Sequence, residues 1–83
     1  MRLARGDTEG ALADYTAALD ANPRYVEAYN NRATARRSRG DLEGAIADYT
    51  RALELVPPDG PDRAMIRENL DAVRVQRATG KAP

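Results

Sequence analysis

An eighteen-residue block occurs twice in this 83-residue sequence, at an interval of 34 positions. Residues 6–23 and residues 40–57 are identical at twelve of their eighteen positions, from Gly6 and Gly40 at the start to Pro23 and Pro57 at the end. A fixed period of this length is typical of stacked helical repeats, in which each unit buries its apolar face against its neighbours. The interval therefore constrains the fold before local propensity does, and it indicates a protein that works by binding at its surface.

Apolar residues recur at helical spacing through most of the chain. This spacing predicts helices over residues 8–21, 25–39, 42–55 and 62–79. We expect Asp7 and Asp41 to cap the two repeated helices, and Gly40 to end the helix before Asp41 with left-handed backbone. Pro23 and Pro57 follow the repeated helices, where proline prevents a helix from continuing. The prediction is an all-α fold of antiparallel helix pairs.

The same spacing predicts which side of each helix is buried. In the two repeated helices we expect burial of Tyr15, Leu19, Tyr49 and Leu53. In the last helix the residues expected on the buried side are Met65, Ile66, Leu70 and Val73. The other faces of that helix are charged. This suits a cap, because the end of a repeat stack must not expose the face that an interior unit buries.

The chain is short enough to form one domain over residues 1–83. Residues 24–57 make a complete helix pair, and residues 58–83 make a C-terminal capping helix and tail. Residues 1–23 read as a truncated first repeat, because the residues that would match 26–34 have no counterpart before them.

Composition disfavours several classes of function. The chain has no Cys and no His, so it lacks thiolate ligands, the commonest metal ligand and the commonest general base. Thirteen basic residues balance thirteen acidic ones, so the broad charge attraction of nucleic-acid-binding proteins is missing. No apolar stretch approaches the ~20 residues that span a bilayer, and no signal peptide is recognisable. We therefore expect a cytoplasmic, non-enzymatic protein without catalytic or metal-binding residues, cofactors, nucleic-acid partners or membrane partners.

The repeated block resembles the second half of the tetratricopeptide repeat, whose 34-residue pattern ends in A-x3-F and then P. The matching residues, with Tyr in place of Phe, are Ala11, Tyr15 and Pro23 in one copy and Ala45, Tyr49 and Pro57 in the other. In the first half of the pattern, Arg32 and Arg36 stand where Leu and Tyr are expected, and their aliphatic stems can still cover apolar surface. The resemblance covers roughly residues 1–58 and implies an α–α superhelix of antiparallel helix pairs.

In tetratricopeptide proteins the first helix of each pair lines a concave groove that holds partner peptides. The resemblance therefore implies a peptide-binding face on the helix at 25–39, formed by Glu27, Asn30, Asn31, Thr34, Arg37 and Ser38. These polar side chains suit an extended peptide, whose backbone needs hydrogen-bond partners. A solvated helix face would have the same composition, so the sequence leaves both interpretations open.

The segment from Tyr29 to Arg32 also resembles the second repeat of the carboxylate-clamp subgroup, which holds the C-terminal tails of heat-shock chaperones. In that subgroup an Asn like Asn31 acts with basic residues four positions apart on the next helix. Arg63 and Arg67 have that spacing. The resemblance thus implies that Asn31, Arg63 and Arg67 together receive a terminal carboxylate or an acidic side chain.

Self-association is the alternative function. If the first repeat is truncated, one apolar side of the helix at 8–21 lacks its partner helix, and a second copy of the chain would cover it. The residues expected at that homo-oligomeric interface are Leu3, Leu12, Tyr15 and Leu19.

Four nearby arginines, Arg32, Arg36, Arg37 and Arg39, admit two interpretations. They could bind phosphate on RNA or on a modified partner. However, acidic residues including Asp48 follow closely, and no aromatic residue lies among the arginines for base stacking. Ion pairs within the protein are the favoured interpretation.

Overall fold

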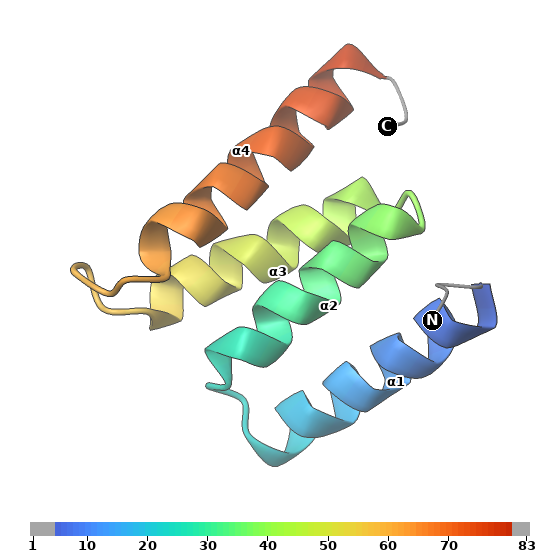
Figure 1. Ribbon diagram of the computed structural model, residues 1–83, viewed down its shortest axis with the longest axis horizontal. Coiled ribbons are helices and arrows are strands. Elements are labelled where there is room, and N and C mark those ends of the chain that lie inside the picture. Colours follow the sequence, from blue (N-terminus) through green and yellow to red (C-terminus); the bar gives the residue numbers. More distant parts are fainter. Residues whose placement is uncertain (1–4, 81–83) are drawn as a thin grey trace.

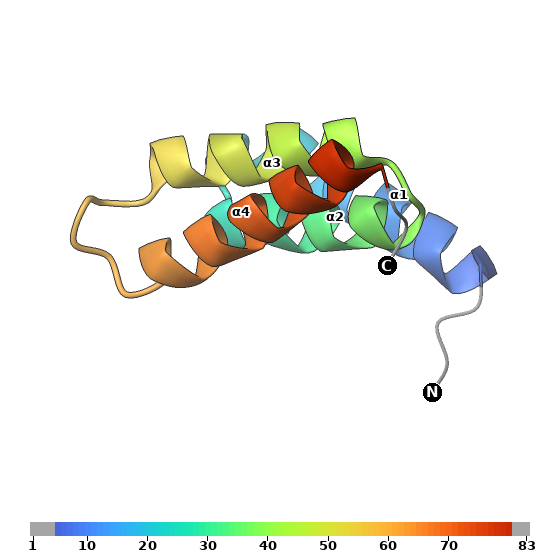
Figure 2. The same cartoon turned by 90° about the horizontal axis from the view of Figure 1, so that it is seen from above.

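The computed structural model describes residues 5–80, and the side chains of residues 8–80. The described residues form four helices: α1 (Arg5–Ala21), α2 (Val26–Ser38), α3 (Leu42–Leu55) and α4 (Arg63–Thr79). Consecutive helices run in opposite directions, and α1 and α4 lie on the two outer sides (Figure 1). Each helix packs on the next along the chain. Seen from above, α3 lies in one layer and α2 and α4 in the other (Figure 2). The predicted all-α fold of antiparallel helices is confirmed.

The two copies of the repeated block begin differently. In the second copy Gly40 has a φ of 87° and ends α2, and the Asp41 carboxylate then accepts a hydrogen bond from the Gly44 amide at 3.0 Å. This cap was predicted. In the first copy α1 already begins at Arg5, so Asp7 lies inside the helix and its predicted capping role is wrong.

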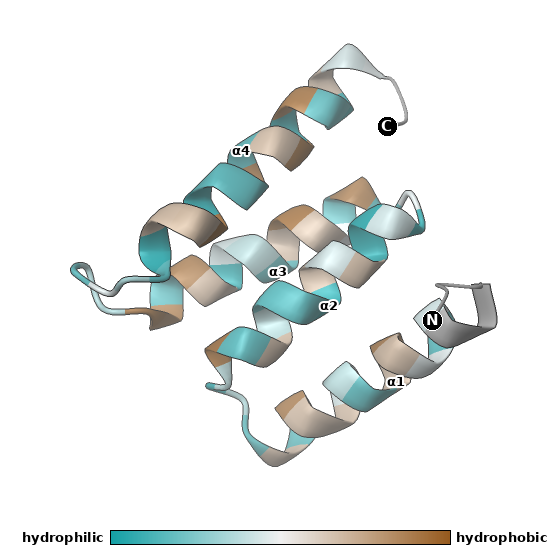
Figure 3. Ribbon diagram, in the orientation of Figure 1, coloured by the Kyte–Doolittle hydropathy of each residue, from teal (hydrophilic) through white to brown (hydrophobic). Residues whose placement is uncertain are grey.

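The core lies where α3 packs between α2 and α4. Three alanines with no exposed surface, Ala33, Ala45 and Ala52, allow α2 and α3 to approach closely, and Tyr49 is 1% exposed beside them. From α4 the core receives Ile66, Leu70 and Val73, as predicted. Burying a large apolar side chain contributes about 1.5–3 kcal/mol. Figure 3 shows how such hydrophobic residues recur among hydrophilic ones along the helices.

One prediction about burial is wrong, and one residue is less buried than its repeat equivalent. Met65 is 48% exposed, because the side of α4 that carries it faces a cleft beside α2 and not the core. Tyr15 is only half-buried, whereas its repeat equivalent Tyr49 is almost fully buried. The difference arises because α2 packs on α3, while no described helix takes the corresponding place on α1. Leu19 is buried and Leu53 packs against the core in a partly buried position.

Candidate functional site

Two clefts lie along one face of α2 and meet at Asn31. The first, of about 390 Å³, separates the start of α2 from the start of α4 and is lined by Val26, Glu27, Asn30, Asn31, Asp62, Met65 and Ile66. The second, of about 200 Å³, separates α1 from the later part of α2 and is lined by Thr8, Ala11, Tyr15, Asn31, Thr34, Ala35 and Ser38. We call this face, with both clefts, the α2 groove.

Five of the six residues predicted on the peptide-binding helix border the α2 groove: Glu27, Asn30, Asn31, Thr34 and Ser38. The structure therefore brings them together. Their part in binding a partner stays a prediction. The family resemblance indicated this helix as the binding face, and the helical spacing is consistent with it, because residues three and four apart share one face.

Arg37, the sixth residue of that set, has a different contact. Its Nε donates a hydrogen bond to Oε1 of Gln76 at 3.0 Å, and Gln76 is buried on α4. This bond ties α2 to α4 near the end of both helices. Sequence reasoning missed Gln76, because nothing in the spacing of α4 distinguishes a buried glutamine from an exposed one.

Some polar groups of the α2 groove are already engaged. The Thr34 hydroxyl donates to the Asn30 carbonyl at 3.1 Å and lies 2.7 Å from the Tyr49 hydroxyl. Because its one proton goes to Asn30, it accepts from Tyr49. The side-chain Oδ1 of Asn30 is buried and has no hydrogen-bond partner within the described part. Asn31, between the two clefts, has no side-chain hydrogen bond to any other described residue.

The carboxylate clamp predicted from Asn31, Arg63 and Arg67 is not assembled. Arg63 donates from Nη1 to the Leu53 carbonyl of α3 at 3.3 Å, so its guanidinium turns toward α3. Arg67 lies one turn later on the same side of α4 and is exposed. Residues four apart share a face, as predicted. Neither arginine lines the cleft beside Asn31. The sequence could not predict this, because the spacing within α4 does not determine the direction in which the helix packs.

The charges of the first cleft also argue against an acidic partner. Its ionisable residues are Glu27 on α2 and Asp62 at the start of α4, and both are carboxylates. A peptide carboxylate placed between them would meet like charges, which is unfavourable. The apolar part of the cleft is Met65 with Val26 and Ile66.

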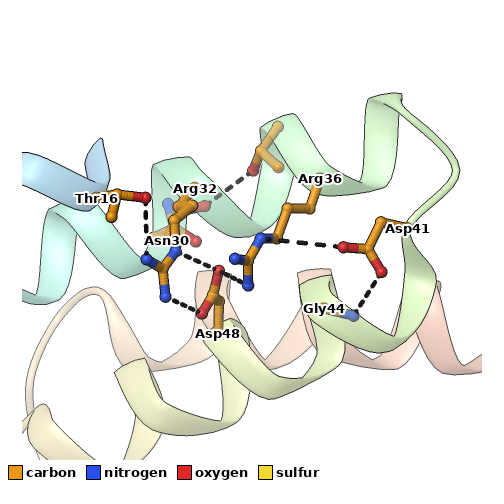
Figure 4. Close-up of polar contacts among 8 residues, drawn as sticks. Thr16, Asn30, Arg32, Arg36, Asp41, Gly44 and Asp48 are labelled. Carbon is orange, nitrogen blue, oxygen red and sulfur yellow. Dashed lines mark hydrogen bonds and ion pairs between the residues drawn. The ribbon is translucent and has the colours of Figure 1, made fainter. Parts of the chain in front are cut away.

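A buried ion-pair network lies beneath the groove, on the side of α2 that packs against α3 (Figure 4). Asp48 is 3% exposed and accepts from Arg32 Nε and Nη2, each at 2.9 Å, and from Arg36 Nη1 at 3.2 Å. The hydrogen bonds to Asp48 raise the pKa of Arg32, against the lowering effect of burial. Arg32 also donates to the Thr16 hydroxyl at 3.3 Å and lies over the Tyr29 ring at 5.7 Å.

The network accounts for the two arginines that depart from the repeat pattern. Arg32 and Arg36 replace Leu and Tyr, and two carboxylates compensate their charge: Asp48 on α3 pairs with both, and Asp41 lies 4.0 Å from Arg36. Of the other two arginines in the cluster, Arg39 pairs with Glu9 at 3.0 Å and Arg37 bonds to Gln76. The predicted ion pairing within the protein is confirmed for Arg32, Arg36 and Arg39, whereas Arg37 bonds to a neutral amide. No phosphate site is needed to explain the cluster.

The residues predicted for self-association are dispersed. Leu19 is 7% exposed and packs inside this chain, so it is not available for an interface. Tyr15 borders the α2 groove, whereas Leu12 borders a shallow cleft near Arg36 and Arg39. Leu3 lies outside the described residues. The prediction is therefore wrong for Leu19, because this side chain is buried within its own chain.

Within residues 5–80, no three Asp, Glu, His or Cys side chains gather in a way that could hold a metal ion. None of the helices α1–α4 is both long and apolar enough to cross a membrane.

Comparison with known proteins agrees with this architecture. The family model described as tetratricopeptide repeat matches residues 2–60, a range that contains α1 to α3 and both copies of the repeated block. Neither the search of curated proteins nor that of solved structures gave a significant match. With most of its length matched, and with the helix pairs and the small-residue contacts in place, this chain belongs to the tetratricopeptide repeat family.

Proposed function

We propose that this chain is a non-catalytic interaction module that binds a segment of a partner protein in the α2 groove. Tetratricopeptide repeats generally mediate protein–protein interaction. The observation that carries the proposal here is the pair of clefts that meet at Asn31, whose side chain has no partner among the described residues. An Asn amide both donates and accepts, so Asn31 suits the backbone of a bound chain.

The first cleft suggests the chemistry of the partner. Glu27 and Asp62 favour a basic side chain, and the exposed part of Met65 favours an apolar one. The segment that we propose therefore carries a Lys or Arg next to a large apolar residue. This replaces the acidic or C-terminal carboxylate partner that the family resemblance implied.

The test uses two short peptides that differ only in charge, one with alternating Lys and Leu and one with alternating Glu and Leu. Chemical shifts of the labelled protein are followed by NMR during titration. We expect the Lys peptide to shift the amides around Asn30 and Asn31, and the Glu peptide to bind more weakly. The double variant Glu27→Gln with Asp62→Asn should lose the preference for Lys.

The matched control is Glu54→Gln, which removes an exposed carboxylate on α3 that pairs with Arg51 at 3.0 Å. This variant should bind as the wild type does. The proposal fails if the chemical-shift changes map to the outer sides of α3 and α4. It also fails if the wild-type protein binds the Lys peptide and the Glu peptide equally.

Self-association through α1 remains the alternative. The observation in its favour is that Ala11, Tyr15 and Ala18 are half-buried, while the equivalent residues of α3 are buried. Sedimentation at micromolar concentration tests this alternative. A monomer across that range would contradict it, and a dimer that Tyr15→Glu dissociates would support it.

A further inference from the structure

The internal repeat allows one face of α1 to be compared with a face that is covered elsewhere in the same molecule. On α3, Ala45 and Tyr49 are at most 1% exposed because α2 packs over them. The residues 34 positions earlier, Ala11 and Tyr15, are half-buried and border the cleft between α1 and α2. Among the described residues no helix lies over α1 as α2 lies over α3.

The comparison extends to a charged residue. Asp48 of α3 is buried and receives three hydrogen bonds from Arg32 and Arg36 of the covering helix. Its repeat equivalent, Asp14 of α1, is exposed and forms no hydrogen bond or ion pair with any residue of the described part. Thus α1 has an apolar stripe with a carboxylate beside it, at the same positions of the repeated block as the stripe and carboxylate with which α3 contacts α2.

We propose that this face of α1, formed by Ala11, Asp14, Tyr15 and Ala18, binds an amphipathic helix of a partner protein that carries an arginine pair for Asp14. The helix would repeat the residues that α2 uses on α3. The pattern begins with an aromatic residue, like Tyr29. Arg-Ala-Thr starts three positions after it, like Arg32, Ala33 and Thr34, and a second Arg follows four positions after the first Arg, like Arg36.

Each part of this pattern has a counterpart contact in the structure. In α2 the two arginines donate hydrogen bonds to the Asp48 carboxylate. Ala33 is packed between the helices with no exposed surface, and the Thr34 hydroxyl accepts a hydrogen bond from Tyr49 of the covered helix. Bidentate bonds between guanidinium and carboxylate add geometric selectivity to charge attraction. The proposal deepens the proposed function for the cleft between α1 and α2, and it rests on that function.

A second copy of the chain is less suited to this face. Its own α2 is engaged with Asp48 through the same two arginines. The outer side of its α4 carries exposed Arg67, Asp71 and Arg74 in place of an apolar stripe. A partner helix with the stated pattern satisfies both the apolar residues and Asp14.

The probe is a blocked synthetic peptide with the sequence of residues 24–39, and binding is measured by fluorescence anisotropy and by NMR shifts. We expect shifts at Ala11, Asp14 and Tyr15, with those of Asp48 and Tyr49 unchanged. Asp14→Asn should weaken binding by about tenfold or more, the effect of losing a charge-assisted hydrogen bond. The control Asp71→Asn, at an exposed site on α4, should bind as the wild type does.

A double-mutant cycle completes the test. A peptide with Gln at the positions of Arg32 and Arg36 should bind wild type and Asp14→Asn alike, because the interaction is already lost. The proposal is overturned if the peptide does not bind at millimolar concentration, or if Asp14→Asn binds the arginine peptide as tightly as the wild type. A concentration-dependent dimer dissociated by Asp14→Asn would assign the face to a second copy instead.

Failure of this proposal is distinguishable from failure of the proposed function. The Lys peptide is tested at Glu27 and Asp62, and the arginine helix is tested at Asp14, so each variant affects one site only.

Discussion

Asp48 is the residue whose replacement tests the packing of α2 on α3 most directly. Asp48→Asn keeps the volume of the side chain but removes its charge, and it places an amide donor against the guanidinium groups of Arg32 and Arg36. Removing one partner of a buried ion pair costs about 3–5 kcal/mol. The side chains of Arg32 and Arg36 are 16% and 30% exposed, so water compensates part of the loss. We therefore expect a cost of about 2–4 kcal/mol.

A domain of this size has a free energy of unfolding of about 4–12 kcal/mol, so the loss should be readily measured. The assay is urea denaturation followed by circular dichroism. Asp14→Asn is the matched control, since it makes the same change at the repeat-equivalent but exposed position. Its free energy of unfolding should change by no more than ~0.5 kcal/mol. If both variants are equally stable, the ion-pair network contributes nothing and the reasoning is wrong.

Three further substitutions within the repeated blocks use the same assay. Gly10→Ala should stabilise the protein by about 0.5–1 kcal/mol, because Ala favours helix and nothing lies within 4 Å of the added methyl group. Gly44→Ala at the equivalent position should destabilise it. At Gly44 the added methyl group would press on the capping carboxylate of Asp41 and lie 2.9 Å from Cδ of Arg36. If Gly10→Ala and Gly44→Ala changed the free energy of unfolding equally, this steric explanation would be contradicted. Tyr49→Phe should cost about 0.5–1.5 kcal/mol by removing the hydrogen bond to Thr34, and an unchanged urea midpoint would show that water replaces it.

Much of the site could be predicted because it lies on one helix. The period of α2 places Glu27, Asn30, Asn31, Thr34 and Ser38 together, and the structure has them along the two clefts. The contribution of α4 could not be predicted in this way. The spacing of Arg63 and Arg67 gives them a common side, but the Leu53 carbonyl of α3 receives Arg63, and Met65 turns to the cleft instead.

The sequence by itself determined the helices and their order, because these follow from a period that each segment carries internally. Only the tertiary structure decided the environment of each copy. Asp14 and Asp48 lie in blocks that are largely identical, as do Tyr15 and Tyr49, yet in each pair one residue is buried and the other is not. The physical reason is that burial depends on which neighbouring helix packs over a face. That neighbour, α2 in the case of α3, lies outside the repeated block, so two nearly identical blocks can have different coverings.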